Sequence, residues 1–356
     1  MLTHDQLRVL QAVHDEPAVT ILWTVPADGG DQPIDGLLAE AAARLRLELT
    51  EHEVAERIAR LRDLAAQVGE DRGERAVALF ASRHHWAVSR LPEPVHDRVV
   101  VDETFATRDL VRALHRSPEY LVLALAEPVT RLYEGRGRIL REVTAGGFPF
   151  TVNAPGQKGR ERRHDPGAAR DRHLESLTHD LDHTEAMAEG GVDGKPLVVI
   201  AAAERLAKFT ARTRFGTRII GAVAHAVGDG VSSAALSGLV WPDVEAWLVG
   251  RRLDALAEVD KAAGAKRLAA GIDEVWPLAR EGRGRLLVVE EGFEYPARLG
   301  GGGRVLEPVD DPTQPGVLDD AVDEAIEYVL TRKGRAAFVP DGTLADRGRI
   351  ALTLRY

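Results

Sequence analysis

The chain has 356 residues and a formal charge of -10, and 44% of its residues are hydrophobic, which is enough to bury the cores of two or three domains. It contains no cysteine, which excludes a disulfide framework and thiolate metal sites and fits a reducing compartment. The first residues lack the pattern of a secretion signal, and no apolar run approaches the roughly 20 residues of a membrane helix, so we expect a cytoplasmic protein with no membrane contact.

The first third of the chain predicts a mixed α/β domain over residues 1–116. Apolar residues at helical spacing follow Pro33 and continue to Leu64, which indicates two consecutive helices. Runs of β-branched and apolar residues indicate strands, because such side chains pack well on a pleated surface. The expected order is a short helix around residues 7–13, a strand over 18–25, the two helices, strands over 75–82, 85–91 and 97–103, and a helix over 107–116.

The middle third, residues 117–241, predicts a second α/β domain with a mixed sheet. Three apolar runs follow one another closely, and Gly135 and Gly137 mark the turn between the second and the third. Helical and strand patterns then alternate, and this order of elements is typical of an α/β domain with a mixed sheet. The expected order is strands over 120–127, 129–136 and 138–144, a helix over 168–189, a strand over 195–203, a helix over 204–213 and a strand over 218–224.

The last third, residues 242–356, predicts a third α/β domain that opens with a long helix from Pro242 to about Ala270. The four glycines Gly300–Gly303 indicate a turn. The remaining expected elements are helices over 270–282 and 318–334 and strands over 285–292, 336–340 and 350–356.

The charge is unevenly distributed along this plan. Residues 1–116 carry 14 basic and 20 acidic side chains, residues 117–240 carry 16 and 15, and residues 241–356 carry 16 and 21. Only the middle third avoids a net negative charge. Binding of a polyanion through one region would account for this pattern, and ordinary surface variation is the alternative.

The stretch "NAPGQKGRERRHDPGAARDRH", residues 153–173, concentrates the basic charge of the middle third and holds almost no large apolar side chain. Glycines beside Gln157 allow the backbone to approach a ligand, and the glutamine amide can orient a water molecule or a ribose hydroxyl. Cations behind it can contact phosphates. A solvated surface loop is the alternative. The candidate RNA-binding residues are Lys158, Arg160, Arg162, Arg163, Arg170 and Arg172, together with Lys208 and Arg212 on the following helix.

Two histidines are a weak candidate for a metal site. His179 and His183 share one face of the helix expected over 168–189, as in zinc-binding helices. The glutamate that metalloproteases place between such histidines is missing, so a structural or solvent-facing role is the favoured interpretation. We therefore expect neither a resident metal nor another cofactor.

The succession of "YLVLALAEPVTRLYEGRGRILREV", a basic Gly-Gln segment and "KPLVVIAAAERLAKF" resembles the middle domain of archaeo-eukaryotic class I release factors and Pelota. The whole chain is similar to the bacterial branch of that superfamily, the bacterial archaeo-eukaryotic release-factor-like proteins, to which "AVTILWTVPADG", "EGRGRLLVVEEG" and "RIALTLRY" also point. The resemblance implies three α/β modules: a divergent N-terminal domain, an RNase-H-like middle domain and a C-terminal domain of the L7Ae type.

The resemblance also implies a function. In release factors the corresponding segment carries Gly-Gly-Gln and promotes ester hydrolysis on the ribosome, which makes Gly156 and Gln157 candidate catalytic residues. Here Pro155 replaces the first glycine, and its fixed φ and missing N–H disfavour the catalytic turn. Bacterial members such as Balon act in ribosome hibernation without peptide release.

We therefore expect a ribosome-associated translation factor that enters the tRNA site and contacts ribosomal RNA or tRNA, in hibernation or rescue. An elongation-factor GTPase is a possible partner. The alternatives are a peptidyl-tRNA hydrolase that uses Gln157 and a metal-dependent hydrolase or nuclease that uses His179 and His183.

Overall fold

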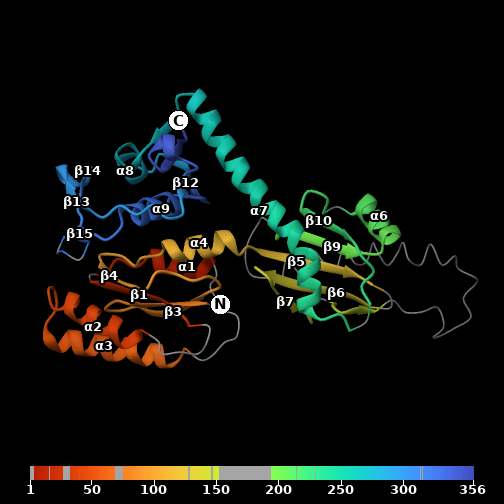
Figure 1. The fold of residues 1–356 in the computed structure, drawn as a ribbon, viewed down its shortest axis with the longest axis horizontal. Coiled ribbons are helices and arrows are strands. Elements are labelled where there is room, and N and C mark those ends of the chain that lie inside the picture. Colours follow the sequence, from red (N-terminus) through yellow and green to blue (C-terminus); the bar gives the residue numbers. More distant parts are fainter. Residues whose placement is uncertain are drawn as a thin grey trace, which may run out of the picture. The chain divides into compact units, whose positions relative to one another are not determined.

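The computed structural model describes residues 4–15, 17–26, 33–68, 75–126, 129–145, 147–151, 194–213, 215–228, 230–312, 314 and 316–356. The chain forms two compact units, one made of Met1–Arg116 and Arg252–Tyr356 and the other of Ser117–Arg251. The architecture is mixed α/β, as the sequence predicted (Figure 1). The finer division into domains over 1–116, 117–241 and 242–356 stays a prediction.

The N-terminal part of the first unit is an antiparallel sheet in the order β3-β2-β1-β4. Trp23 and Phe80 are among its fully buried side chains, which explains why its strands appear in the sequence as continuous apolar runs. Its elements are α1 (His4–Gln11), β1 (Ala18–Thr24), α2 (Ile34–Leu45), α3 (Glu51–Ala66), β2 (Ala76–Ala81), β3 (Trp86–Leu91), β4 (Arg98–Asp102) and α4 (Arg108–Arg116).

Helices cover both faces of this sheet. Leu38 and Leu45 of α2 and Leu61 of α3 pack on the face that carries Trp23. Thr50 and Glu53 form a capping box at the start of α3, which satisfies amide groups that no helical carbonyl can reach. The opposite face carries Phe80 and belongs to a larger core shared with the C-terminal part of the chain.

The C-terminal part of the first unit contains a mixed sheet in the order β11-β17-β12-β16 and a small antiparallel sheet in the order β14-β13-β15. The sequence did not predict β11 or the small sheet. The elements are β11 (Leu268–Ala270), α8 (Ile272–Arg280), β12 (Gly284–Glu290), β13 (Ala297–Gly300), η1 (Gly301–Gly303), β14 (Val305–Pro308), β15 (Val317–Leu318), α9 (Ala321–Thr331), β16 (Arg335–Val339), η2 (Ala345–Arg347) and β17 (Ile350–Leu354).

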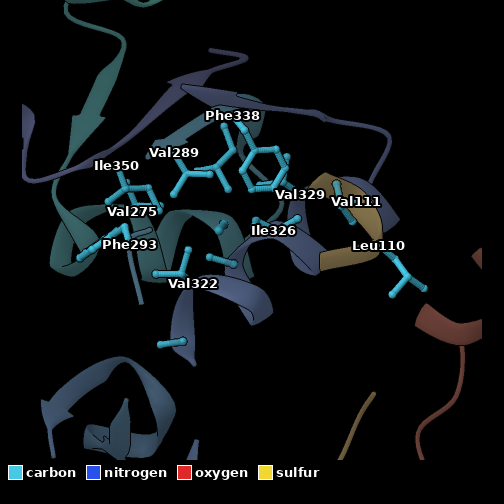
Figure 2. Packing of buried hydrophobic residues seen from close by; sticks show 14 of the residues in the cluster. Leu110, Val111, Val275, Val289, Phe293, Val322, Ile326, Val329, Phe338 and Ile350 are labelled. Carbon is cyan, nitrogen blue, oxygen red and sulfur yellow. The ribbon is translucent and has the colours of Figure 1, made fainter. Parts of the chain in front are cut away.

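One hydrophobic core joins the two parts of the first unit. Leu110 and Val111 of α4 belong to the same buried cluster as Ile326 and Val329 of α9, and Figure 2 shows Ile326 and Val329 beside Phe338 of β16. The imidazole of His115 meets the ring of Phe338 edge-on, with 5.9 Å between the ring centroids. Residues separated by more than 200 positions therefore share a single core.

The second unit is built on a mixed sheet in the order β10-β9-β5-β6-β7, with β8 paired to β6. The sheet is mixed, as the sequence predicted: strands β5, β9 and β10 are parallel, whereas β5, β6 and β7 are antiparallel neighbours. The elements are β5 (Glu119–Leu125), β6 (Val129–Arg136), β7 (Ile139–Glu142), β8 (Phe150–Thr151), β9 (Leu197–Ala201), α6 (Ala203–Arg212), β10 (Ile219–Ala224) and α7 (Ser233–Gly264), of which α7 continues into the first unit.

The two faces of this sheet bind different helices (Figure 1). Leu206 and Phe209 of α6 pack on one face, and Leu236, Val240 and Val244 of α7 pack on the other. The helix expected to begin at Pro242 in fact begins at Ser233 and runs through the proline. Burial of Leu236 and Val240 on the sheet favours helix ahead of Pro242 and outweighs the loss of one backbone hydrogen bond. The helix expected over 168–189 lies outside the described residues.

Candidate functional site

On either side of residues 152–193, the interval that contains the basic segment, the described chain belongs to the sheet of the second unit at two separate places. Before this interval, Thr151 of β8 pairs with Val129 at the beginning of β6. After it, Lys195 precedes β9 and lies beside Glu134, near the end of β6. Five strand positions separate Val129 from Glu134, so the two attachments lie roughly 17 Å apart along the sheet.

Ion pairs hold the place where the chain re-enters the sheet. The Nζ of Lys195 lies 3.4 Å from Glu119 and 3.2 Å from Glu134, and Arg136 forms a second ion pair with Glu119. Burial alone would raise the pKa of Glu119, but Arg136 and Lys195 lower it below its ordinary value. Glu119 therefore stays ionised and anchors both cations.

Arg218 reinforces this anchor from the turn before β10. Its Nε donates to the carbonyl oxygen of Lys195 at 3.1 Å, and its guanidinium lies over the ring of Phe215. A side chain at Gly194 would collide with this guanidinium, since a Cβ there would lie 2.6 Å from its central carbon. No local sequence pattern predicts this cluster, because its members come from separate elements.

Tyr120, next to Glu119 on β5, stabilises the pairing of β5 with β6. Its ring covers Gly135, the residue directly opposite on β6, and its hydroxyl donates to the carbonyl oxygen of Gly137 at 2.8 Å. Burial raises the pKa of Tyr120 to about 12. The glycines that marked a turn in the sequence are thus also required for close packing.

The predicted RNA-binding residues on α6 lie on a helix, as expected. Lys208 is half-exposed and pairs with Glu204 one turn earlier, at 2.8 Å. Arg212 is the last residue of the helix. Arg205 donates to the carbonyl oxygen of Leu125, at the end of β5.

The other predicted site residues lie outside the described residues. They are the candidate catalytic Gly156 and Gln157, the cations Lys158, Arg160, Arg162, Arg163, Arg170 and Arg172, and the histidines His179 and His183. Their roles remain predictions. Among the residues that the structure describes, no group of three or more histidines and carboxylates could hold a metal ion. In the same residues, no helix is long and apolar enough to cross a membrane.

A cluster of carboxylates lies between the two parts of the first unit. Arg108 and Asp320 form a buried ion pair at 2.7 Å, and Asp323 accepts a hydrogen bond from the backbone N–H of Thr107 at 2.9 Å. Burial raises the pKa of Glu327 to about 8 and that of Asp102 to about 7. The raised pKa values keep part of these carboxyl groups protonated near neutral pH, and the cluster lies at a structural interface.

The sheet of the second unit lies within the part of the chain that matches a known family. Residues 119–283 match the family model described as bacterial archaeo-eukaryotic release factor family 3. This match confirms, over less than half of the chain, that the protein resembles the bacterial archaeo-eukaryotic release-factor-like family. A search of the curated proteins finds no match.

Solved structures of related type resemble the chain distantly. A model of ribosome-bound archaeal Pelota and ABCE1 contains a chain that is 11% identical, with a TM-score of 0.46, over 99% of this chain and 94% of that one. Archaeal translation termination factor aRF1 is 14% identical, with a TM-score of 0.25, over 99% and 96% of the two chains. Dom34 of S. cerevisiae is 10% identical, with a TM-score of 0.39, over 79% and 80%.

Proposed function

We propose that the protein is a ribosome-associated translation factor of the release-factor type and that residues 117–241 enter the tRNA site. The observation that carries this proposal is the family match over residues 119–283, which includes the basic segment. A cytoplasmic role in ribosome hibernation or rescue, with delivery by an elongation-factor GTPase, belongs to the same proposal.

The chemistry of the basic segment supports contact with RNA. Arg160, Arg162 and Arg163 lie within four consecutive positions and can each bind a phosphate oxygen with a planar guanidinium. Ion pairs at Lys195 and the pairing of Thr151 hold the chain to one sheet on both sides of residues 152–193, the interval that contains the segment.

Peptidyl-tRNA hydrolysis is a second candidate function, because Gly156 and Gln157 match the last two residues of the release-factor motif. Pro155 stands where the motif has its first glycine. Proline holds φ near -65° and supplies no N–H, so we expect little or no ester hydrolysis. A metal-dependent reaction at His179 and His183 stays a prediction with no further support.

Cosedimentation with purified ribosomes at moderate salt tests the proposal. The variant Arg160→Glu, Arg162→Glu, Arg163→Glu should lose binding, because it removes three phosphate contacts and adds charges that repel phosphates. Each lost contact should also reduce the slope of log affinity against log salt by up to about 0.9. Gln157→Ala should still bind, since a neutral amide contributes about 0.5–1.5 kcal/mol per hydrogen bond. A matched control reverses three exposed arginines of the first unit: Arg62, Arg83 and Arg298.

Equal loss in the control and in the segment variant would show nonspecific charge attraction and contradict the proposal. A peptide-release assay separates the two candidate functions. Robust hydrolysis by the wild type that disappears in Gln157→Ala, with ribosome binding retained, would make the hydrolase the correct function.

A further inference from the structure

A dense row of cations lies along one edge of the mixed sheet in the C-terminal part of the first unit. At this edge β12 and β16 begin, β17 ends and the chain enters β11. Strand pairing brings the ends together, since Leu286 pairs with Arg335 and Gly284 pairs with Leu354. We call the set the basic rim; its members are Lys266, Arg267, Arg283, Arg285, Arg332, Lys333, Arg335 and Arg355.

Backbone hydrogen bonds fix the rim in place. The N–H of Leu354 donates to the carbonyl oxygen of Arg267 at 2.9 Å, and the N–H of Arg355 donates to that of Arg283 at 3.1 Å. The guanidinium of Arg355 also donates to the carbonyl oxygens of Gly284 and Arg332. Four turns that are distant in the sequence are therefore tied into one rigid surface, beside the last turn of α7 and the C-terminal end of the chain (Figure 1).

The rim has a large surplus of positive charge. Its cations are exposed except for Arg283, which is half-buried. Glu258 of α7 pairs with Arg285 at 3.2 Å and with Arg335 at 2.6 Å, yet the side chains of both arginines remain at least 60% exposed. Among the described residues, no carboxylate lies within ion-pair distance of Lys266, Arg267 or Lys333. The nearby Glu281 pairs instead with Arg304.

Capping of helix ends explains only part of the rim. Helices α8 and α9 end at this edge, and cations near a helix C-terminus interact favourably with its dipole. The helix dipole accounts for Arg332. It does not account for Arg267, Arg285 and Arg335, which lie in strands or directly before one. Lys266 and Lys333 have φ values of 56° and 61°, where glycine or asparagine is the usual residue, so backbone geometry does not select lysine there.

The dimensions and chemistry of the rim suit a nucleic-acid backbone. Four strands spaced about 4.8 Å apart span roughly 14 Å, and a duplex with one charge per ~1.7 Å presents about eight phosphates over that length. Most of the cations are arginines, whose guanidinium groups bind two phosphate oxygens at once. Within the part of the chain that the structure describes, the Nε of Arg283 has no hydrogen-bond partner, and its guanidinium lies 5.7 Å from the centroid of the Tyr356 ring.

We propose that the basic rim binds the phosphate backbone of double-helical RNA. The choice of RNA over DNA rests on the proposed function, whereas the binding of phosphates rests on the rim alone. The surface is separate from residues 153–173, and it gives the protein a second contact with a large RNA. An acidic protein is the competing partner, and the experiment distinguishes it.

Fluorescence anisotropy with a labelled RNA duplex of about 20 base pairs, in a salt titration, tests the proposal. All proteins carry Arg160→Glu, Arg162→Glu and Arg163→Glu, which removes the contribution of the basic segment. Adding Arg267→Gln, Lys333→Gln and Arg335→Gln should weaken binding at least tenfold and make the slope of log affinity against log salt less negative by roughly 2. The control adds Arg62→Gln, Arg83→Gln and Arg298→Gln and should leave both unchanged.

A charge-preserving variant separates binding from folding. Arg267→Lys, Lys333→Arg and Arg335→Lys keep every charge and should keep the slope. Equal slopes for the rim variant and the control would overturn the proposal, as would tighter binding of a duplex DNA or of polyglutamate. This outcome is independent of the ribosome assay. If the duplex binds through the rim but the wild-type protein does not cosediment with ribosomes, the proposed role of the rim is supported and the proposed function is refuted.

Discussion

Replacing Arg108 with methionine should weaken the contact between the two parts of the first compact unit. The guanidinium of Arg108 donates to Asp320 at 2.7 Å and to the carbonyl oxygen of Glu291 at 2.7 Å, and only 3% of its side chain is exposed. Methionine fills much of the space but leaves a buried carboxylate without its counterion.

The structure sets the size of the effect. Breaking a buried ion pair by removing one partner costs about 3–5 kcal/mol. The backbone N–H groups of Tyr295 and Val322 still donate to Asp320, which places the loss at the lower end, about 3 kcal/mol. For a unit of roughly 220 residues this corresponds to a fall in Tm of about 6–12 °C.

Differential scanning calorimetry and urea unfolding measure this loss. The double variant Arg108→Met, Asp320→Asn should recover most of the stability, because asparagine keeps an acceptor for the two amides and leaves no unpaired charge. A loss below about 1 kcal/mol in the single variant would refute the reasoning. So would a double variant as unstable as the single one.

Two further predictions concern stability. Burial raises the pKa of Glu327 to about 8 and that of Asp102 to about 7. Between about pH 5 and these values the folded protein therefore keeps protons that the unfolded chain has already released. The free energy of unfolding should therefore fall as the pH rises from about 5 to 8, and Glu327→Gln should reduce that fall. Tm measured across this pH range tests the prediction, and an equal pH dependence in the variant and the wild type would contradict it. Gly135→Ala should destabilise the second unit by about 1–3 kcal/mol in urea unfolding, because the added methyl group meets the ring of Tyr120. The matched change Gly36→Ala, on an exposed face of α2 with no atom within 4 Å, should instead stabilise by about 0.5–1 kcal/mol; the same sign for both would contradict the account.

Strongly patterned elements were predictable from the sequence. The apolar run that begins at Ala18 became β1, and the helical spacing that follows Pro33 became α2. The order of strands before and after the basic segment was also correct and gave the mixed sheet of the second unit. These elements bury one face or both, so hydrophobic periodicity describes them well.

Other elements depended on contacts that no local pattern records. The small sheet of β13, β14 and β15 is short, contains Pro308 and turns through the glycines Gly301–Gly303, so its sequence is typical of a loop. Helix α7 runs through Pro242 because Leu236 and Val240 are buried on the sheet. Tertiary packing outweighed the local signal in both places.

The candidate binding surfaces differ in the same way. Residues 153–173 are contiguous, so their charge is visible in the sequence. The members of the basic rim are spread between Lys266 and Arg355 and meet only through the register of β12, β16 and β17. The region that contains them has a net negative charge, so the charge counted along the chain does not reveal the rim.

The most direct test of the central claim is a cryo-electron-microscopy reconstruction of ribosomes isolated with the tagged protein. The account predicts density for residues 117–241 in the tRNA site, with Arg160, Arg162 and Arg163 against ribosomal RNA or tRNA. Density for the protein at another site, or ribosomes that carry no such density at saturating protein, would contradict it.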